Sequence, residues 1–257
     1  MPEGHSRDSS RLRERRTAPE KLSVAPQHFY RTTAAPCPYL PDKTERKLVT
    51  ELAGRQAGAF YNELSRAGFR RSHHLAYRPA CSGCSACVPV RIPVADFVES
   101  RSLRRIRNLN RDLTRRCTPP EATLEQFRLF QRYQRSRHAD SDMAAMSFGD
   151  YQSMIEDSPV ATALLELRDS VGVLMGIGLY DPLDDGLSAV YSFYTPEASK
   201  RSLGTMLVLA LVDEARRRNL AYVYLGYWIA GSAKMSYKAR FHPLDALGRD
   251  GWSRLAD

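Results

Sequence analysis

The chain has 257 residues, of which 43% are hydrophobic and 26% are charged, values typical of one large or two modest globular domains. Its formal net charge of +9 favours a polyanionic partner, nucleic acid first and an anionic membrane surface second. No run approaches the roughly 20 apolar residues that span a bilayer, and the N-terminus lacks the apolar segment of a signal peptide. We therefore expect a cytoplasmic protein with no membrane partner, whose five cysteines stay reduced.

The N-terminal region is expected to combine a disordered tail with a long first helix. Residues 1–27 are rich in Arg, Ser, Pro and Glu and hold few large apolar side chains, which predicts disorder. Folded structure is expected from residue 28. A helix is predicted over residues 42–67, because Asp42 and Glu45 fit a capping box and the following apolar residues recur at helical spacing.

A loop flanked by prolines carries Cys81, Cys84 and Cys87 in the pattern Cys-x-x-Cys-x-x-Cys. Two-residue gaps let successive thiolates converge on one metal centre, and Cys37, also followed by proline, is the natural fourth ligand. Either Zn²⁺ or an iron–sulfur cluster would satisfy this set, in a structural or redox-sensing role, and spacing does not choose between them. Reduced thiols without metal are the alternative, and Cys117 is expected to take no part.

Two further features follow the cysteine loop. Val88–Val94 alternates as a strand does, but its two prolines predict an edge strand or an extended segment. Residues 101–116 hold seven arginines and one acid, and are predicted to form a helix. Arg101, Arg104 and Arg105 lie close together on one side of it. The opposite, buried side is expected to hold Leu103, Ile106, Leu109 and Leu113.

A solvated charged face is the usual explanation of such a charge run. Here arginine dominates so heavily that like-charge repulsion needs an anion to relieve it. We therefore expect the arginine-rich helix to bind nucleic-acid phosphates.

The remainder of the chain is predicted to be a second domain of mixed α/β structure. Pro119 and Pro120 indicate a boundary between an N-terminal domain, residues 28–117, and a C-terminal domain, residues 118–257. The predicted order is helix, helix, strand, strand, strand, helix, strand. The corresponding ranges are 124–137, 148–156, 162–167, 172–180, 187–194, 202–218 and 221–225. The last strand–helix–strand unit predicts parallel neighbours joined by a right-handed crossover.

The start of the helix over 202–218 carries cations, hydroxyls and a glycine. Free N–H groups and the positive end of the helix dipole favour a phosphate there. The Arg-x-x-Gly spacing also resembles the pyrophosphate-binding turn of GNAT-type acyltransferases. We expect Lys200, Arg201, Ser202 and Gly204 to bind phosphate, which requires this turn and the arginine-rich helix to share one face. An ordinary basic helix start, with its glycine packed on the sheet, is the alternative.

Short motifs over about residues 28–255 resemble those of aminoacyl-tRNA–protein transferases. The N-terminal motifs are Phe29-Tyr30, Cys37-Pro38-Tyr39-Leu40, Tyr77-Arg78-Pro79, the cysteine triplet and Ser102-Leu103-Arg104-Arg105. The C-terminal motifs are Arg201-Ser202-Leu203-Gly204, Tyr224-Leu225-Gly226-Tyr227-Trp228-Ile229, Lys234-Met235-Ser236-Tyr237-Lys238 and Phe241-His242-Pro243. The chain is similar to the compact bacterial branch, which moves leucine from leucyl-tRNA onto proteins that begin with Asp or Glu and so marks them for N-degron degradation. The resemblance implies a GNAT-like C-terminal part, with a smaller cysteine-containing α+β N-terminal domain.

The reaction implied by this resemblance needs positioning and charge rather than a cofactor. The acceptor α-amine, with an ordinary pKa of about 7.7–8.0, attacks an activated ester at the tRNA 3′ end. We expect Arg78 or Arg31 to hold the acceptor carboxylate, since a guanidinium matches it bidentately.

The catalytic candidates are Tyr227, Lys234, Tyr237 and Lys238, which follow the last predicted strand, where GNAT-type folds open their acyl site. A lysine would stabilise the oxyanion and a tyrosine would relay the amine's proton. Packing is the alternative for each tyrosine, and a solvated charge for each lysine. No buried carboxylate base is evident.

Three other functions compete with leucyl transfer. Arginine in place of leucine as the donor keeps the class of enzyme. An acetyl-CoA-dependent acetyltransferase fits the glycine turn but needs neither the arginine-rich helix nor the cysteine loop. A non-catalytic RNA-binding module with a structural zinc explains the charge and the cysteines, but not the Lys-Met-Ser-Tyr-Lys element.

Overall fold

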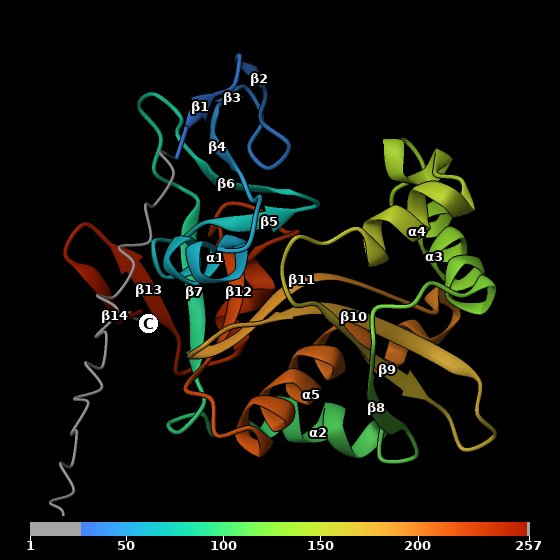
Figure 1. Cartoon of the computed structure of the whole chain (residues 1–257). Coiled ribbons are helices and arrows are strands. Elements are labelled where there is room, and N and C mark those ends of the chain that lie inside the picture. The colour runs from blue at the N-terminus through green and yellow to red at the C-terminus, as the bar shows by residue number, and fades with distance from the viewer. Residues whose placement is uncertain (1–26, 256–257) are drawn as a thin grey trace, which may run out of the picture.

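The computed structural model of the chain describes residues 27–255, so the predicted tail lies outside the described residues except for its last member. An eight-stranded sheet in the order β14-β13-β7-β12-β11-β10-β9-β8 runs through the molecule (Figure 1). Its strands are β7 (Val88–Pro93), β8 (Thr114–Thr118), β9 (Ala163–Arg168), β10 (Leu174–Pro182), β11 (Gly186–Tyr194), β12 (Tyr222–Trp228), β13 (Asp245–Gly248) and β14 (Gly251–Arg254).

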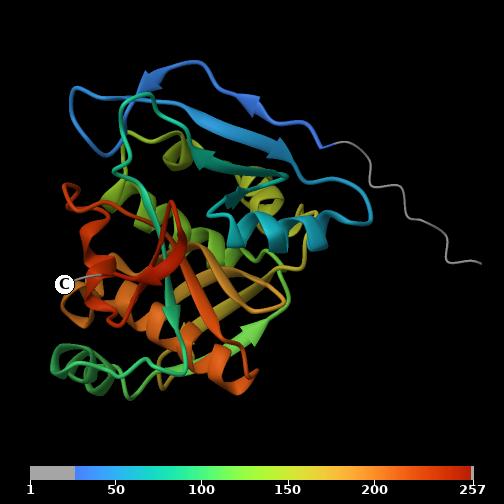
Figure 2. The same cartoon turned by 90° about the vertical axis from the view of Figure 1, so that its left-hand side faces the viewer.

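A smaller sheet in the order β1-β4-β6-β5 lies at the opposite end of the molecule from α2 and α5 (Figure 1, Figure 2). It contains β1 (Tyr30–Arg31), β4 (Lys47–Glu51), β5 (Arg70–Ser72) and β6 (Leu75–Pro79), and β2 (Ala35–Pro36) pairs separately with β3 (Thr44–Glu45). The small sheet and α1 (Ala57–Arg66) bury Tyr61, Phe69 and Ala76 in one cluster with Tyr224 of β12. This cluster joins the N-terminal elements to the large sheet.

Helices cover both faces of the large sheet. One face carries α2 (Arg101–Leu109) and α5 (Leu203–Arg217), and the other carries α3 (Leu124–Arg137) and α4 (Phe148–Glu156) (Figure 1). Short 3₁₀ helices are η1 (Asp142–Ala145), η2 (Pro196–Arg201) and η3 (Ser236–Arg240). Capping boxes at Thr123–Gln126 and Ser147–Asp150 start α3 and α4. No helix within residues 27–255 has the length and apolarity that a membrane crossing needs.

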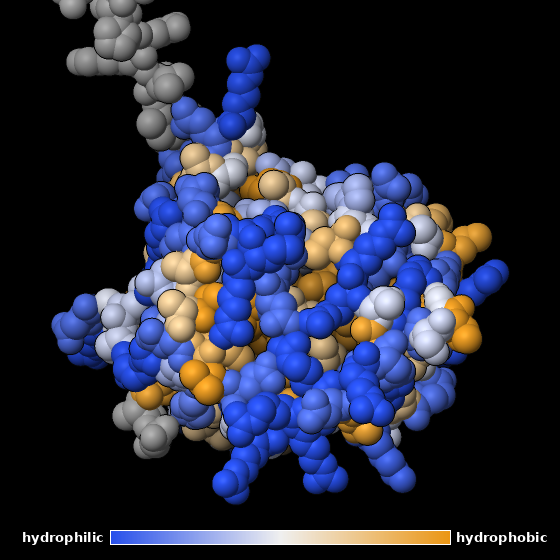
Figure 3. Space-filling view, turned by 90° about the horizontal axis from the view of Figure 1, so that it is seen from below, coloured by the Kyte–Doolittle hydropathy of each residue, from blue (hydrophilic) through white to orange (hydrophobic). Residues whose placement is uncertain are grey.

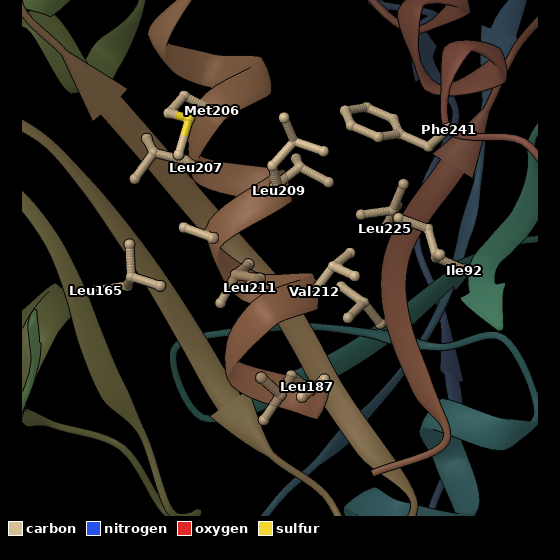
Figure 4. Packing of buried hydrophobic residues seen from close by; sticks show 14 of the residues in the cluster. Ile92, Leu165, Leu187, Met206, Leu207, Leu209, Leu211, Val212, Leu225 and Phe241 are labelled. Atoms are coloured by element: carbon tan, nitrogen blue, oxygen red, sulfur yellow. The ribbon is translucent and has the colours of Figure 1, made fainter. Parts of the chain in front are cut away.

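Helix α5 is buried nearly all round because it lies between the sheet and α2. Leu207, Leu209, Leu211 and Val212 point toward the strands or their connections (Figure 4). A helix that is apolar on every side is stable in water only in such a position. The predicted strand–helix–strand unit is confirmed, since β11 and β12, which precede and follow α5 in the chain, pair in parallel. The mixed α/β class and the element order predicted after residue 123 are also confirmed.

The long helix predicted over residues 42–67 is wrong in its first half. Lys47–Glu51 is strand β4, and the helix begins only at Ala57. Asp42 has a φ of 58°, in the left-handed region rather than the extended region of an N-cap. Because β4 pairs with β6 along its whole length, tertiary pairing outweighs the helical spacing of its apolar residues.

The predicted edge position of the proline-bearing strand is also wrong, since β7 lies between β13 and β12. The N–H of Val94 donates to the carbonyl of Ala221, so alternate nitrogens of this segment face β12. The nitrogens of Pro89 and Pro93 therefore face β13, which pairs with only two residues in the middle of β7. Neither proline stands where the ladder needs a donor.

The arginine-rich segment is a shorter helix than predicted. Helix α2 ends at Leu109, and the arginines at positions 115 and 116 belong to β8. Leu109 is 50% exposed instead of buried, whereas Leu103 and Ile106 are buried as expected. Strands β7 and β8 both belong to the large sheet, so that sheet crosses the predicted boundary at residue 118, and the division into two domains stays a prediction.

A buried ion pair connects the small sheet to the large one. Arg71 of β5 donates from Nε and Nη2 to the two carboxylate oxygens of Asp181 on β10, each at 2.7 Å. The two side chains are only 1% and 0% exposed. Removing one charge of such a pair leaves the other buried and uncompensated.

We therefore expect Asp181→Asn to lower the free energy of unfolding by about 3 kcal/mol in chemical denaturation. The matched control is Asp184→Asn in the following turn, where the side chain is 71% exposed, and it should change stability by less than about 0.5 kcal/mol. Equal effects of the two substitutions would contradict a structural role for the buried pair.

Candidate functional site

The two basic elements predicted to contact phosphate lie side by side. Asn110, at the end of α2, donates from Nδ2 to the carbonyl of Arg201 at 2.8 Å, and Arg201 Nε donates back to its Oδ1 at 2.9 Å. Figure 3 views the face that carries α2 and α5, and hydrophilic side chains cover most of it. The requirement that the arginine-rich helix and the glycine turn share one face is therefore met.

The arginine-rich helix does not depend on a bound polyanion alone to relieve its charge. Arg107 forms ion pairs with Glu99 and Asp213, and Arg115 of β8 also contacts Asp213. Arg201 pairs with Asp112. The expectation that repulsion within residues 101–116 needs an external anion is thus wrong for Arg107 and Arg115.

Other cations remain available on the same face. Arg101 and Arg105 are exposed and have no carboxylate partner among the described residues. Arg104 donates only to the carbonyl of Glu99, and Lys200 is exposed. These four side chains are free to contact RNA phosphates.

Gly204 of the glycine turn has a packing reason to be glycine. A Cβ at this position would lie 3.0 Å from the ring of Tyr194, which also contacts Tyr133 with ring centroids 5.0 Å apart. Ser202 has a φ of 53°, and its carbonyl oxygen accepts hydrogen bonds from the N–H groups of Thr205 and Met206 at the start of α5. The turn brings the end of β11 against the helix start.

Three of the four catalytic candidates lie close together, one at the end of β12 and two in the segment that follows it. The Tyr227 hydroxyl is buried and donates to the carbonyls of Gly68 and Tyr77, at 3.0 and 3.1 Å, and burial raises its pKa. This engagement favours positioning over proton relay. Tyr237 is 40% exposed, and burial of its hydroxyl end raises its pKa. Lys238 is buried, and its Nζ donates to the carbonyl of Tyr227 at 2.5 Å.

Lys238 is a lysine that is not reliably charged near neutral pH. Burial, with a smaller contribution from the Arg70 guanidinium, lowers its pKa to about 7. Lys234 is exposed and lies near His138 at the end of α3, whose pKa is lowered by burial and by this lysine. The structure thus separates the two lysines of the Lys-Met-Ser-Tyr-Lys element by environment.

Arg70 of β5 belongs to this site, although no sequence motif pointed to it. Its Nη2 donates to the carbonyl of Val190 at 3.0 Å, while its buried Nη1 has no hydrogen-bond partner within residues 27–255. Gly226 has a φ of 74°, and a Cβ there would lie 2.5 Å from Nη1. The glycine therefore permits both the backbone conformation and the close approach of the guanidinium.

The two arginines expected to hold the acceptor carboxylate lie on the N-terminal sheet. Arg31 is exposed and donates to the carbonyl of Ala80 and the hydroxyl of Ser82. Arg78 is exposed, donates to the carbonyl of Ala67 at 3.4 Å, and packs over the ring of Phe69. Neither forms an ion pair among the described residues, so both stay candidates.

The cysteines predicted to bind metal lie near one another without forming a metal site. Burial raises the pKa of Cys87 to about 11, with contributions from Cys81, Cys37 and Cys84. Across residues 27–255, however, no three His, Cys, Asp or Glu side chains lie close enough to hold a metal ion. The predicted Zn²⁺ or iron–sulfur site is therefore not confirmed, and no chemical step is assigned to either.

Comparison with known proteins gives consistent matches along the chain. The family models described as arginine-tRNA-protein transferase match residues 35–105 with the N-terminal model and residues 125–248 with the C-terminal model. The chain is 56% identical over 231 residues to an aspartate/glutamate leucyltransferase of Paramagnetospirillum magneticum, covering 90% of this chain and 95% of that protein. A protein of the same name from Rhodospirillum rubrum is 54% identical over 228 residues, covering 88% of this chain and 93% of that protein.

Similarity to solved structures is much weaker. The C-terminal domain of a putative lysylphosphatidylglycerol synthetase from Agrobacterium fabrum matches with a TM-score of 0.48 and 12% identity, over 76% of this chain and 63% of that chain. A likeness of this degree supports no statement about activity.

The lowered pKa of Lys238 predicts a specific pH dependence of stability. An unfolded lysine keeps its proton up to a pH of about 10.4, whereas folded Lys238 releases its proton near pH 7. Between these values the unfolded state binds more protons, so this group makes stability rise with pH.

The free energy of unfolding of the wild type, relative to Lys238→Met, should accordingly increase by about 2 kcal/mol from pH 7 to pH 9. Urea denaturation at each pH measures it, and Lys234→Met, which changes an exposed lysine, should show no such trend. A constant difference between wild type and Lys238→Met would show that Lys238 keeps an ordinary pKa.

Proposed function

The chain belongs to the arginine-tRNA-protein transferase family, and on that premise we propose that it transfers leucine from leucyl-tRNA to the α-amino group of proteins that begin with Asp or Glu. The observation that carries the proposal is the identity of 54–56% to relatives named aspartate/glutamate leucyltransferase. The two partners are aminoacyl-tRNA and acidic N-termini, and the modified proteins would enter the N-degron route. A cytoplasmic setting follows from the need for charged tRNA.

The reaction is an aminolysis that needs no cofactor. The neutral α-amine of the acceptor attacks the carbonyl carbon of the leucyl ester, a peptide bond forms, and the carbon–oxygen bond to the terminal ribose breaks. The amine loses one proton, and the ribose oxygen gains one. A base with a pKa near the working pH and a donor for the developing oxyanion are therefore useful.

The side chains after β12 offer groups for both tasks. Lys238, with a pKa of about 7, can accept the proton of the attacking amine. Tyr237, whose side chain is partly exposed, carries a hydroxyl that can donate to the oxyanion or pass a proton. Tyr227 fixes the carbonyl to which Lys238 donates, so it acts as a positioning residue, and Lys234 lies too far toward α3 to be assigned a step.

The basic face supports tRNA as the donor of leucine. Arg101, Arg104 and Arg105 are exposed on α2, whose C-terminal end contacts Arg201 of the glycine turn, and Lys200 is exposed next to Arg201. Acetyl-CoA as the donor would leave this cluster unexplained. The cysteine cluster requires no part in the chemistry, and a bound metal at that loop would be structural or regulatory.

Radiolabelled leucine supplied on charged tRNA should be transferred to peptides beginning with Asp or Glu, and not to peptides beginning with Lys or Ala. A matched reaction with arginyl-tRNA is the control for the donor. Transfer of arginine but not leucine would overturn the donor and keep the class of enzyme. Absence of transfer from either tRNA would reject the proposal.

Replacing Arg101, Arg104 and Arg105 together by Gln should raise the KM for leucyl-tRNA at moderate salt. The slope of log affinity for tRNA against log salt concentration should become shallower by about 2, since each lost phosphate contact contributes roughly 0.7–0.9. Arg249→Gln, an exposed arginine after β13, is the matched control. An unchanged salt slope in the triple variant would remove α2 from the tRNA-binding surface.

A further inference from the structure

Arg70 and Lys238 are two neighbouring basic groups for which no carboxylate partner is present within residues 27–255. We propose that Arg70 binds the side-chain carboxylate of the N-terminal Asp or Glu of the acceptor. The chemical identity of this ligand rests on the proposed function; the need for an anion rests on the structure alone.

The neighbouring arginine shows what a satisfied guanidinium looks like in this protein. Arg71, on the other side of β5, forms two hydrogen bonds of 2.7 Å with the Asp181 carboxylate. Arg70 has only the carbonyl of Val190 for Nη2, and its Nη1 is buried without a partner among the described residues. A buried guanidinium nitrogen without an acceptor costs folding free energy, and an anion that binds at half-buried Arg70 would supply that acceptor.

The strands around Arg70 provide the space for its guanidinium. β11 and β12 pair only between residues 186–188 and 222–224, and β12 has a register shift just before Gly226. Beyond that point Val190 offers its carbonyl to Arg70 instead of to a strand partner. With no side chain at Gly226, the guanidinium lies directly against the β12 backbone. β11 and β12 are thus not paired with each other beside the guanidinium, and no strand carbonyl accepts a hydrogen bond from Nη1 there.

The position of Arg70 favours an acceptor carboxylate over a tRNA phosphate. The exposed arginines suited to phosphates lie on α2, at the opposite end of the molecule from the small sheet (Figure 1). Arg70 lies on the small sheet and is close enough to Lys238 and Tyr237 to affect the pKa of each. A carboxylate held there places the adjacent α-amine of the same residue beside Lys238, the group assigned to take its proton.

The test is leucyl transfer to matched peptides that begin with Asp, Glu or Asn. Arg70→Gln should lower kcat/KM for the Asp and Glu peptides at least about thirtyfold, the loss expected when one partner of a buried charged hydrogen bond is removed. The preference for Asp over Asn should fall to near one, while the KM for leucyl-tRNA stays within about twofold. Arg70→Lys keeps the positive charge but loses the planar guanidinium that can bind a carboxylate through two hydrogen bonds. Its kcat/KM for the Asp and Glu peptides should lie between those of the wild type and Arg70→Gln.

Controls distinguish specificity from loss of folding. Arg55→Gln changes an exposed arginine near the start of α1 and should leave the Asp-over-Asn preference intact. If Arg70→Gln retains that preference, or raises the KM for leucyl-tRNA instead, the proposal is overturned. The same holds if Arg78→Gln or Arg31→Gln abolishes the preference while Arg70→Gln does not.

A measurement on the unmodified protein covers the case in which Arg70→Gln fails to fold. At constant ionic strength, acetate should compete with the Asp peptide and not with leucyl-tRNA, whereas inorganic phosphate should compete with leucyl-tRNA. Acetate that competes with neither substrate would reject a carboxylate site. Wild-type protein that transfers no leucine at all would reject the proposed function instead, so the two failures are distinct.

Discussion

β11 and β12 share hydrogen bonds only along their first three residues, and the candidate site is built from what fills the space beyond. The guanidinium of Arg70 takes the carbonyl that β12 leaves free, and Gly226 makes room for it. Tyr227, the residue before the last one of β12, ties that strand to the N-terminal elements through the backbone carbonyls of Gly68 and Tyr77. The buried Lys238 then donates to the Tyr227 carbonyl, so each group fixes the next.

The elements with the strongest local signals could be predicted from the sequence. Helices α3 and α4 carry capping boxes, and α5 is apolar nearly all round from Met206 to Val212, so local and tertiary preferences agree. The sequence predicts a helix over Lys47–Glu51 because the spacing of apolar residues does not distinguish helix from strand over so few residues. Pairing with β6 decides that this segment is a strand. The local sequence of β7 does not show that the nitrogens of Pro89 and Pro93 face positions where β13 forms no pairing with β7.

The candidate site was predictable only in part for a similar reason. Sequence placed Tyr237 and Lys238 after the last strand, but burial sets their properties, and burial depends on residues far away in the chain. Arg70 and Arg71 are indistinguishable in the sequence; only the fold gives Asp181 to one and leaves the other without an anion. Likewise, Asp213 lies about a hundred residues from the arginines that it neutralises.

The most direct measurement of the central claim is an experimental structure of the protein with a short peptide that begins with Asp, in the absence of leucyl-tRNA. The account predicts that the Asp side-chain carboxylate lies about 3 Å from Arg70 Nη1, with the peptide α-amine directed toward Lys238. A carboxylate bound instead at Arg78 or Arg31, with Arg70 Nη1 still without a partner, would contradict it.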